Sequence, residues 1–101
     1  LMQEMWAHYR LARSRLQAGD AQGAATSATH AIALCDAHHA PPFERFCACA
    51  ALALAHRAAG ERDAFDDARA RALAAHASLA DDERPLAAAD LAAIEGAPQN
   101  P

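Results

Sequence analysis

An internal repeat constrains the fold of this 101-residue chain more than any other feature of its sequence. Three segments of the first half recur 41 residues later: Leu11-Ala12 as Leu52-Ala53, Ala18-Gly19-Asp20 as Ala59-Gly60-Glu61, and Ala31-Ile32-Ala33 as Ala72-Leu73-Ala74. A unit of this length suits two antiparallel helices, and stacked units of that kind bury a core that one unit cannot form alone. The repeat predicts an all-α chain, an antiparallel helix-hairpin array (α-solenoid) of about five helices.

The composition favours helices as well. The chain holds 32 Ala, ten Leu and two Ile, and it has no Val. Alanine is the best helix former, whereas the β-branched and aromatic residues that favour strands are scarce. Each buried methylene contributes about 0.8 kcal/mol, so a core made mainly of Ala yields little stability per residue. We expect helices throughout and a thin core.

Apolar residues at steps of three and four predict helices near residues 2–18, 21–38, 42–59, 62–79 and 84–95. Gly19 and Gly60 are expected to end the first and third helices in the left-handed conformation that glycine adopts easily. Pro41-Pro42 interrupts the chain after the second helix, and proline suits the first turn of the third. Asp81-Asp82 is expected to cap the fifth helix.

The turns and small residues of this pattern resemble tetratricopeptide repeats. In that family, helix pairs turn at a Gly-Asp, as at Gly19-Asp20 and Gly60-Glu61, and small residues lie where helices cross. The small residues that match are Ala12, Ala53, Ala24, Ala28 and Ala31. The period of 41 residues exceeds the family's 34, and Asp36 stands where the family usually has proline. The chain is therefore most similar to the longer helical repeats of bacterial regulators.

This resemblance implies one helical repeat domain over residues 1–96. Repeat one would span about 2–39, repeat two about 42–80, and a C-terminal capping helix about 84–95, followed by a tail at 97–101. Because the chain begins at Leu1 inside an apparent helix, we expect it to be the C-terminal part of a larger protein.

The charge pattern argues against nucleic-acid and membrane partners. The formal net charge is −4, all nine basic residues are Arg, and no basic run occurs. No apolar stretch approaches the roughly 20 residues of a membrane span, and no signal peptide is recognisable. Three Cys without the spacing of a disulfide framework suit reduced thiols. We expect a cytoplasmic, bacterial protein.

Cysteine and histidine residues near the middle of the chain raise a metal or redox hypothesis. Cys35 and His38, with Cys47 or Cys49, could approach one another across the loop. Zinc needs four tetrahedral ligands, but residues two apart on a helix point in nearly opposite directions, which separates Cys47 from Cys49. Free Cys more often behaves as a small buried apolar residue. We therefore predict no metal and no cofactor.

Nothing in the sequence indicates an enzyme. A catalytic Cys–His pair would need an activated thiolate and an oxyanion site, for which no pattern is evident. The acidic groups Asp66-Asp67 and Asp81-Asp82-Glu83 suit an exposed helix face and a helix cap better than carboxylate catalysis.

The expected function is a protein–protein interaction scaffold that binds a protein or peptide partner. In tetratricopeptide arrays the first helix of each pair lines the concave surface, which implies partner-binding roles for Trp6, Tyr9, Arg13, Leu54 and Arg57. Aromatic residues and Arg are frequent anchors at interfaces. The family's carboxylate clamp needs Lys and Asn at set positions, and that clamp is missing here.

A structural oligomerisation module is the alternative function. The first helix carries Met2, Met5, Trp6 and Tyr9, which are large apolar groups that need a cover. An upstream helix pair would supply it in a longer protein, or Trp6 and Tyr9 would serve a partner. In the isolated chain we expect a homodimer through the first helix.

Overall fold

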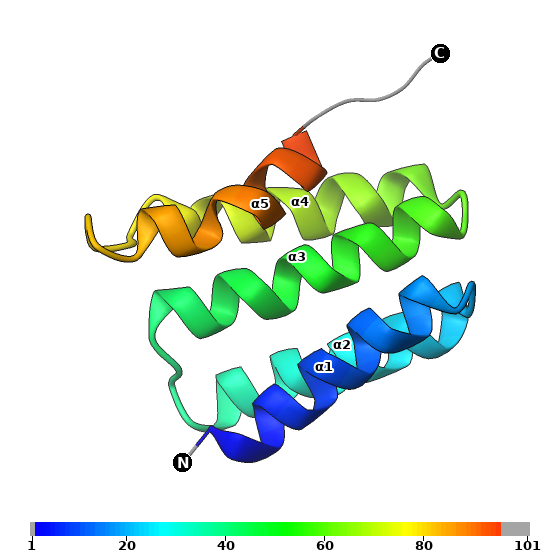
Figure 1. Cartoon of the computed structure of the whole chain (residues 1–101), viewed down its shortest axis with the longest axis horizontal. Helices are drawn as coiled ribbons and strands as arrows, with labels where there is room; N and C mark the ends of the chain where they lie inside the picture. Colours follow the sequence, from blue (N-terminus) through cyan, green and yellow to red (C-terminus); the bar gives the residue numbers. More distant parts are fainter. Residues whose placement is uncertain (1, 96–101) are drawn as a thin grey trace.

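The computed structural model describes residues 2–95, which form five α-helices and no strand. The helices are α1 (Gln3–Gln17), α2 (Ala21–Ala37), α3 (Pro42–Ala58), α4 (Arg62–His76) and α5 (Arg84–Glu95). The predicted all-α hairpin array is confirmed, with α1–α2 and α3–α4 as the two hairpins (Figure 1). Only α4 departs clearly from the expected bounds, because it ends three residues before position 79. The predicted tail at 97–101 lies outside the described residues.

The two hairpins turn at the glycines that the sequence singled out. Gly19 and Gly60 have φ angles of 87° and 75°, in the left-handed region that side chains with a Cβ avoid. In each turn the next residue donates a backbone hydrogen bond to a carbonyl of the preceding helix. These bonds join Asp20 N to Arg15 O at 2.8 Å and Glu61 N to His56 O at 2.9 Å. Both glycines are therefore helix C-caps of the same kind.

Helix α2 ends in a similar turn without a glycine. His39 occupies the left-handed position with a φ angle of 49°, and Ala40 N donates to Cys35 O at 2.9 Å. Pro41 then adopts an extended conformation, and α3 begins at Pro42 as predicted. In the loop between the two hairpins, His39 in the left-handed conformation ends α2, and a proline begins α3.

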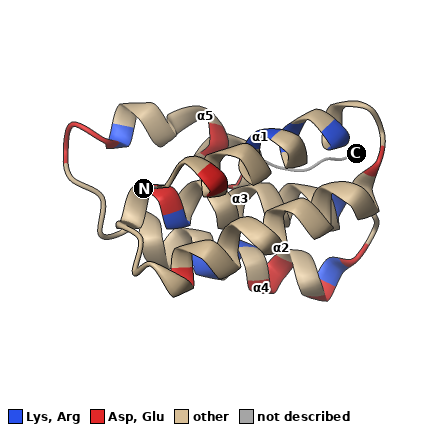
Figure 2. Cartoon of the chain, turned by 90° about the horizontal axis from the view of Figure 1, so that it is seen from below, with Lys and Arg blue, Asp and Glu red and all other residues tan. Residues whose placement is uncertain are grey.

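The central element of the molecule is α3. Helices α1 and α2 contact it from the first hairpin, α4 pairs with it, and α5 crosses its remaining side. Figure 2 shows α1 and α5 on one side of α3, with α2 and α4 on the other. The ten residues from Phe46 to Ala55 are consequently all buried.

Small side chains make this arrangement possible. Those ten residues are Phe46, two leucines and seven Ala or Cys. Because most of these side chains are small, neighbouring helices can approach α3 closely from every side. Phe46 and Met5 are the largest side chains that are fully buried. The core is thus mostly alanine, with few large apolar groups to fill it.

The start of α5 differs from the expected cap. Asp81-Asp82 was predicted to supply it, but the acidic side chain that bonds to the backbone at this turn is Glu83. Glu83 Oε1 accepts a hydrogen bond from Ala80 N at 3.0 Å. Asp81 Oδ1 instead lies 3.8 Å from Arg84 Nε. No helix within residues 2–95 has the length and hydropathy needed to cross a membrane.

Candidate functional site

The predicted partner-binding residues of α1 lie together in the structure. Trp6 and Tyr9 pack edge to face with ring centroids 5.4 Å apart. Trp6 also packs beside Phe43 of α3, with ring centroids 6.1 Å apart. Edge-to-face packing is a favoured geometry for aromatic pairs. This cluster is half-buried, so its large apolar groups are partly covered within the chain.

A carboxylate from α5 bridges two of these residues. The Tyr9 hydroxyl donates to Asp90 Oδ2 at 3.1 Å, and Arg13 Nη1 donates to Asp90 Oδ1 at 2.9 Å. Burial, followed by the negative charge of Asp90, raises the pKa of Tyr9 to about 12. The bridge joins α1 to α5 across α3 and was not expected from the sequence.

Helix α5 therefore covers part of the face on which partner binding was predicted. Leu54, on α3, is only 8% exposed and belongs to the core. A partner could contact Leu54 only if a neighbouring helix moved. Trp6, Tyr9 and Arg13 are thus brought together, Leu54 is buried beneath its neighbours, and Arg57 lies elsewhere.

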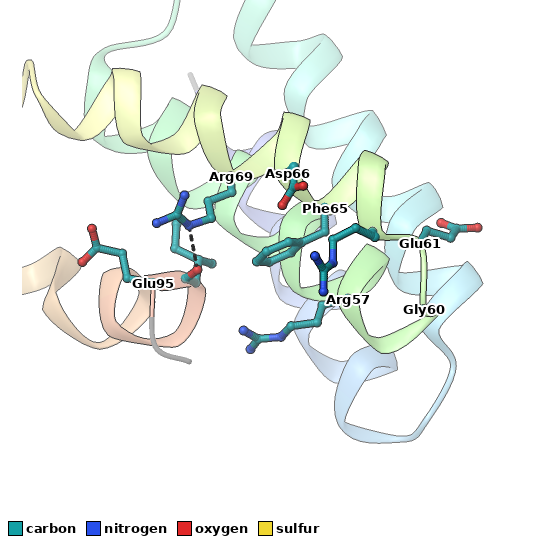
Figure 3. A pocket seen from close by; sticks show the side chains of 9 residues that line it. Arg57, Gly60, Glu61, Phe65, Asp66, Arg69 and Glu95 are labelled. Atoms are coloured by element: carbon teal, nitrogen blue, oxygen red, sulfur yellow. Dashed lines mark hydrogen bonds between the residues drawn. The ribbon is translucent and has the colours of Figure 1, made fainter. Parts of the chain in front are cut away.

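Arg57 lines a hollow between the end of α3, the first half of α4 and the end of α5 (Figure 3). This space, called the Arg57 hollow here, has a volume of about 610 Å³. Its lining residues are Arg57, Gly60, Glu61, Arg62, Phe65, Asp66, Arg69, Ile94 and Glu95. The guanidinium of Arg57 lies 5.5 Å from the centroid of the Phe65 ring, a distance at which a cation is attracted to an aromatic face.

The arginines of the Arg57 hollow are not paired with its acidic residues. Within the described residues, no carboxylate lies within 4 Å of the guanidinium groups of Arg57, Arg62 or Arg69. Arg69 Nε donates instead to the carbonyl of Ile94 at 3.0 Å, which ties α4 to the last turn of α5. The hollow thus combines three arginines with an aromatic ring.

The acidic residues of the lining are mostly directed elsewhere. Glu61 Oε1 accepts a hydrogen bond from His56 Nδ1 at 2.7 Å, and in Figure 3 the Glu61 side chain points away from Phe65. In Figure 3 the carboxylate of Glu95 also points away from the Phe65 ring. Asp66 is the third acidic residue of the lining, which therefore holds as many acidic residues as arginines.

The cysteines have the environment of core residues. Cys35, Cys47 and Cys49 are free and buried. Burial raises the pKa of Cys35 to about 11 and that of Cys47 to about 12, and it also raises the pKa of Cys49. The reactive thiolate is therefore disfavoured at neutral pH. Over residues 2–95, no three His, Cys, Asp or Glu side chains are grouped as metal ligands would be.

Two lining residues of the Arg57 hollow, Phe65 and Arg69, were not predicted from the sequence. Neither residue was expected to have a functional role. The 41-residue offset contains a signal for both, because their equivalents in repeat one are Ala24 and Ala28. A change from small residues to Phe and Arg at equivalent positions indicates that repeat two has a different neighbour there.

Comparison with known proteins gives no family or function for this chain. No protein-family model, curated protein or solved structure matches the chain significantly. The resemblance to tetratricopeptide repeats consequently stays a prediction, and function is inferred from the chemistry of the two surfaces.

Proposed function

We propose that the chain is a protein–protein interaction scaffold of the tetratricopeptide type, which binds a protein or peptide partner and has no catalytic activity. The Arg57 hollow carries this proposal. It is an open space of about 610 Å³ where arginines without carboxylate partners in the described structure surround an aromatic ring. Arg and aromatic side chains anchor partners more often than other residues do.

The α1 cluster is the second surface of the proposed scaffold. Trp6, Tyr9 and Arg13 offer half-buried aromatic and cationic groups at the edge of the array. The Asp90 bridge already uses the polar ends of Tyr9 and Arg13. A partner at this surface would therefore compete with Asp90, whereas a partner in the Arg57 hollow would not.

Site-specific photo-crosslinking in the native host tests the proposal. A photoreactive phenylalanine analogue would replace Arg57, Trp6 or, as a control, the exposed Ala33 of α2. We expect a discrete adduct with one other protein from position 57 or position 6 and none from position 33. The partner, identified by mass spectrometry and purified, should then bind the wild-type chain more tightly than the Arg57→Ala variant.

Adducts containing only a second copy of this chain would instead favour the oligomerisation module. Leu11 of α1 is exposed and supplies an apolar group for such a contact. Sedimentation would then show a dimer that Trp6→Ala weakens. Equal labelling of all three positions, or no adduct from any of them, would contradict the scaffold.

A further inference from the structure

The Arg57 hollow lies where the second repeat departs from the packing of the first. Equivalent positions at the 41-residue offset are Leu16 and Arg57, Ala24 and Phe65, and Ala28 and Arg69. In the first repeat, Ala24 and Ala28 are buried on the inner face of α2, and α3 packs closely along that helix. Small residues there allow the next helix to approach.

The corresponding contact of the second repeat is much less extensive. Helix α5 follows α4 as α3 follows α2, yet far fewer of its residues lie close to α4. Phe65 and Arg69 are only partly buried and line open space between the two helices. The larger side chains of repeat two therefore lie where α5 is not closely packed on the first half of α4.

The arginines that line this open space have hydrogen-bond donors that are not used within the described structure. Arg69 Nε donates a hydrogen bond to the carbonyl of Ile94, whereas its Nη atoms donate none among the described residues. Arg57 contacts the face of Phe65, and Arg62 is exposed beside it. Guanidinium groups bind carboxylates with paired hydrogen bonds, which are stronger than those between neutral groups.

We propose that the Arg57 hollow binds an acidic segment of a partner protein. Carboxylates of that segment would pair with Arg57 and Arg62, and an apolar side chain between them would pack on the partly exposed ring of Phe65. This inference rests on the proposed scaffold function and names the partner's chemistry. Charge complementarity selects the occupant, because within the described residues the three arginines of the hollow have no carboxylate partner, and Glu61 and Glu95 point away from the Phe65 ring (Figure 3).

A peptide titration followed by NMR tests this assignment on the full chain. The probe is a capped hexapeptide with two glutamates on each side of a Leu-Phe pair. One control peptide has lysines in place of the glutamates, and another has Gly-Gly in place of Leu-Phe. We expect the acidic Leu-Phe peptide to shift the backbone amides of residues 57–69 and 94, and both controls to bind at least about tenfold more weakly.

Matched arginine variants separate specific binding from general attraction. The Arg57→Ala/Arg62→Ala double variant should lose about tenfold in affinity, whereas Arg10→Ala/Arg71→Ala, at exposed positions away from the hollow, should lose less than about twofold. Both double variants change the net charge equally. Arg57→Glu/Arg62→Glu should bind the lysine peptide instead, a reversal that a loss of folding cannot produce.

Three outcomes would overturn the assignment. The first is no shift near the hollow at millimolar peptide, and the second is equal weakening by the two alanine double variants. The third is an equal response to inorganic phosphate alone, which would make the hollow a general anion site. Shifts confined to Trp6, Tyr9 and Arg13 would also reject the hollow but would leave the scaffold function standing.

Discussion

The α1–α2 and α3–α4 hairpins share their glycine turns but differ in what surrounds their first helix. Helix α3 is covered on all sides, whereas the outer face of α1 meets only the edge of α5 through Asp90. The equivalents of Trp6, Tyr9 and Arg13 in α3 are Cys47, Ala50 and Leu54, all of which are buried. The same repeat positions are therefore partly exposed in one hairpin and buried in the other, because different helices surround them.

The turns themselves differ in how the second helix is capped. The Asp20 carboxylate accepts a hydrogen bond from Gly23 N at 2.9 Å, which caps α2. Glu61 has the same backbone position, but its side chain bonds to His56 and does not cap α4. A Cβ on Gly23 would lie 2.1 Å from Asp20 Oδ2, and the equivalent residue in α4 is Ala64. The cap and the glycine thus occur together in one repeat and are both missing from the other.

The largest expected effect comes from truncating the central core. Met5 and Phe46 are equivalent positions, and both are 0% exposed. Phe46→Ala should lower the free energy of unfolding by about 3–5 kcal/mol, because it leaves a cavity in the centre of the bundle. Met5→Ala should cost about 2–4 kcal/mol, since α1 lies at the edge and can relax.

Urea denaturation measures both core variants. Leu86→Ala is the matched control, because that side chain is 71% exposed and its loss should change stability by less than about 0.5 kcal/mol. A larger loss for Met5→Ala than for Phe46→Ala would contradict the central position of α3.

Close helix crossings give the next effect. Ala28 and Ala72 are fully buried on the inner faces of α2 and α4. Enlarging either to Leu should destabilise the chain by about 1–3 kcal/mol, because the packed helices leave no room for three more carbons. Ala33→Leu and Ala74→Leu, on exposed positions of the same helices, should be nearly neutral in thermal unfolding. Parental stability in both buried variants would show that the crossings are loose.

The helical pattern was predictable from the sequence because it depends on local signals. Gly19, Gly60 and Pro42 fix three helix boundaries through backbone conformation alone, and the alanine periodicity identifies the buried faces. The Asp90 bridge was not predictable, since it joins residues about 80 positions apart through the orientation of α5. The position of the Arg57 hollow depends on the same orientation, so Arg57 was the one lining residue predicted to bind a partner, and for a different reason.

A smaller and more specific effect is expected at the cap of α2. Asp20→Ala should cost about 1 kcal/mol, whereas Glu61→Ala should cost no more than about 0.5 kcal/mol. Gly23→Ala should fail to stabilise the wild-type helix, because the new Cβ meets the capping carboxylate.

A double-mutant cycle sharpens this prediction. In the Asp20→Ala background, Gly23→Ala should become stabilising by about 0.5–1 kcal/mol, as it is in ordinary helices. Chemical denaturation of the four proteins gives the coupling energy. Additive effects would mean that the cap and the glycine are independent.

The smallest expected effect is a gain in stability at the loop between the hairpins. His39 holds the left-handed conformation that glycine holds in the other two turns. His39→Gly should stabilise the chain by up to about 1 kcal/mol, because it removes the steric strain on the Cβ. Gly19→Ala, measured in the same thermal denaturation series, should destabilise by a similar amount. A loss of stability in His39→Gly would show that the His side chain itself supports the turn.

Native-state hydrogen exchange tests most directly whether the second repeat is open where the first is closed. If α5 stands away from α4, its amides should exchange through an opening that leaves the rest of the chain folded. We expect the opening free energy of residues 87–94 to lie at least about 2 kcal/mol below that of residues 47–55 in α3. Equal opening free energies, with both helices exchanging only by global unfolding, would contradict the account and place α5 within a single closed core.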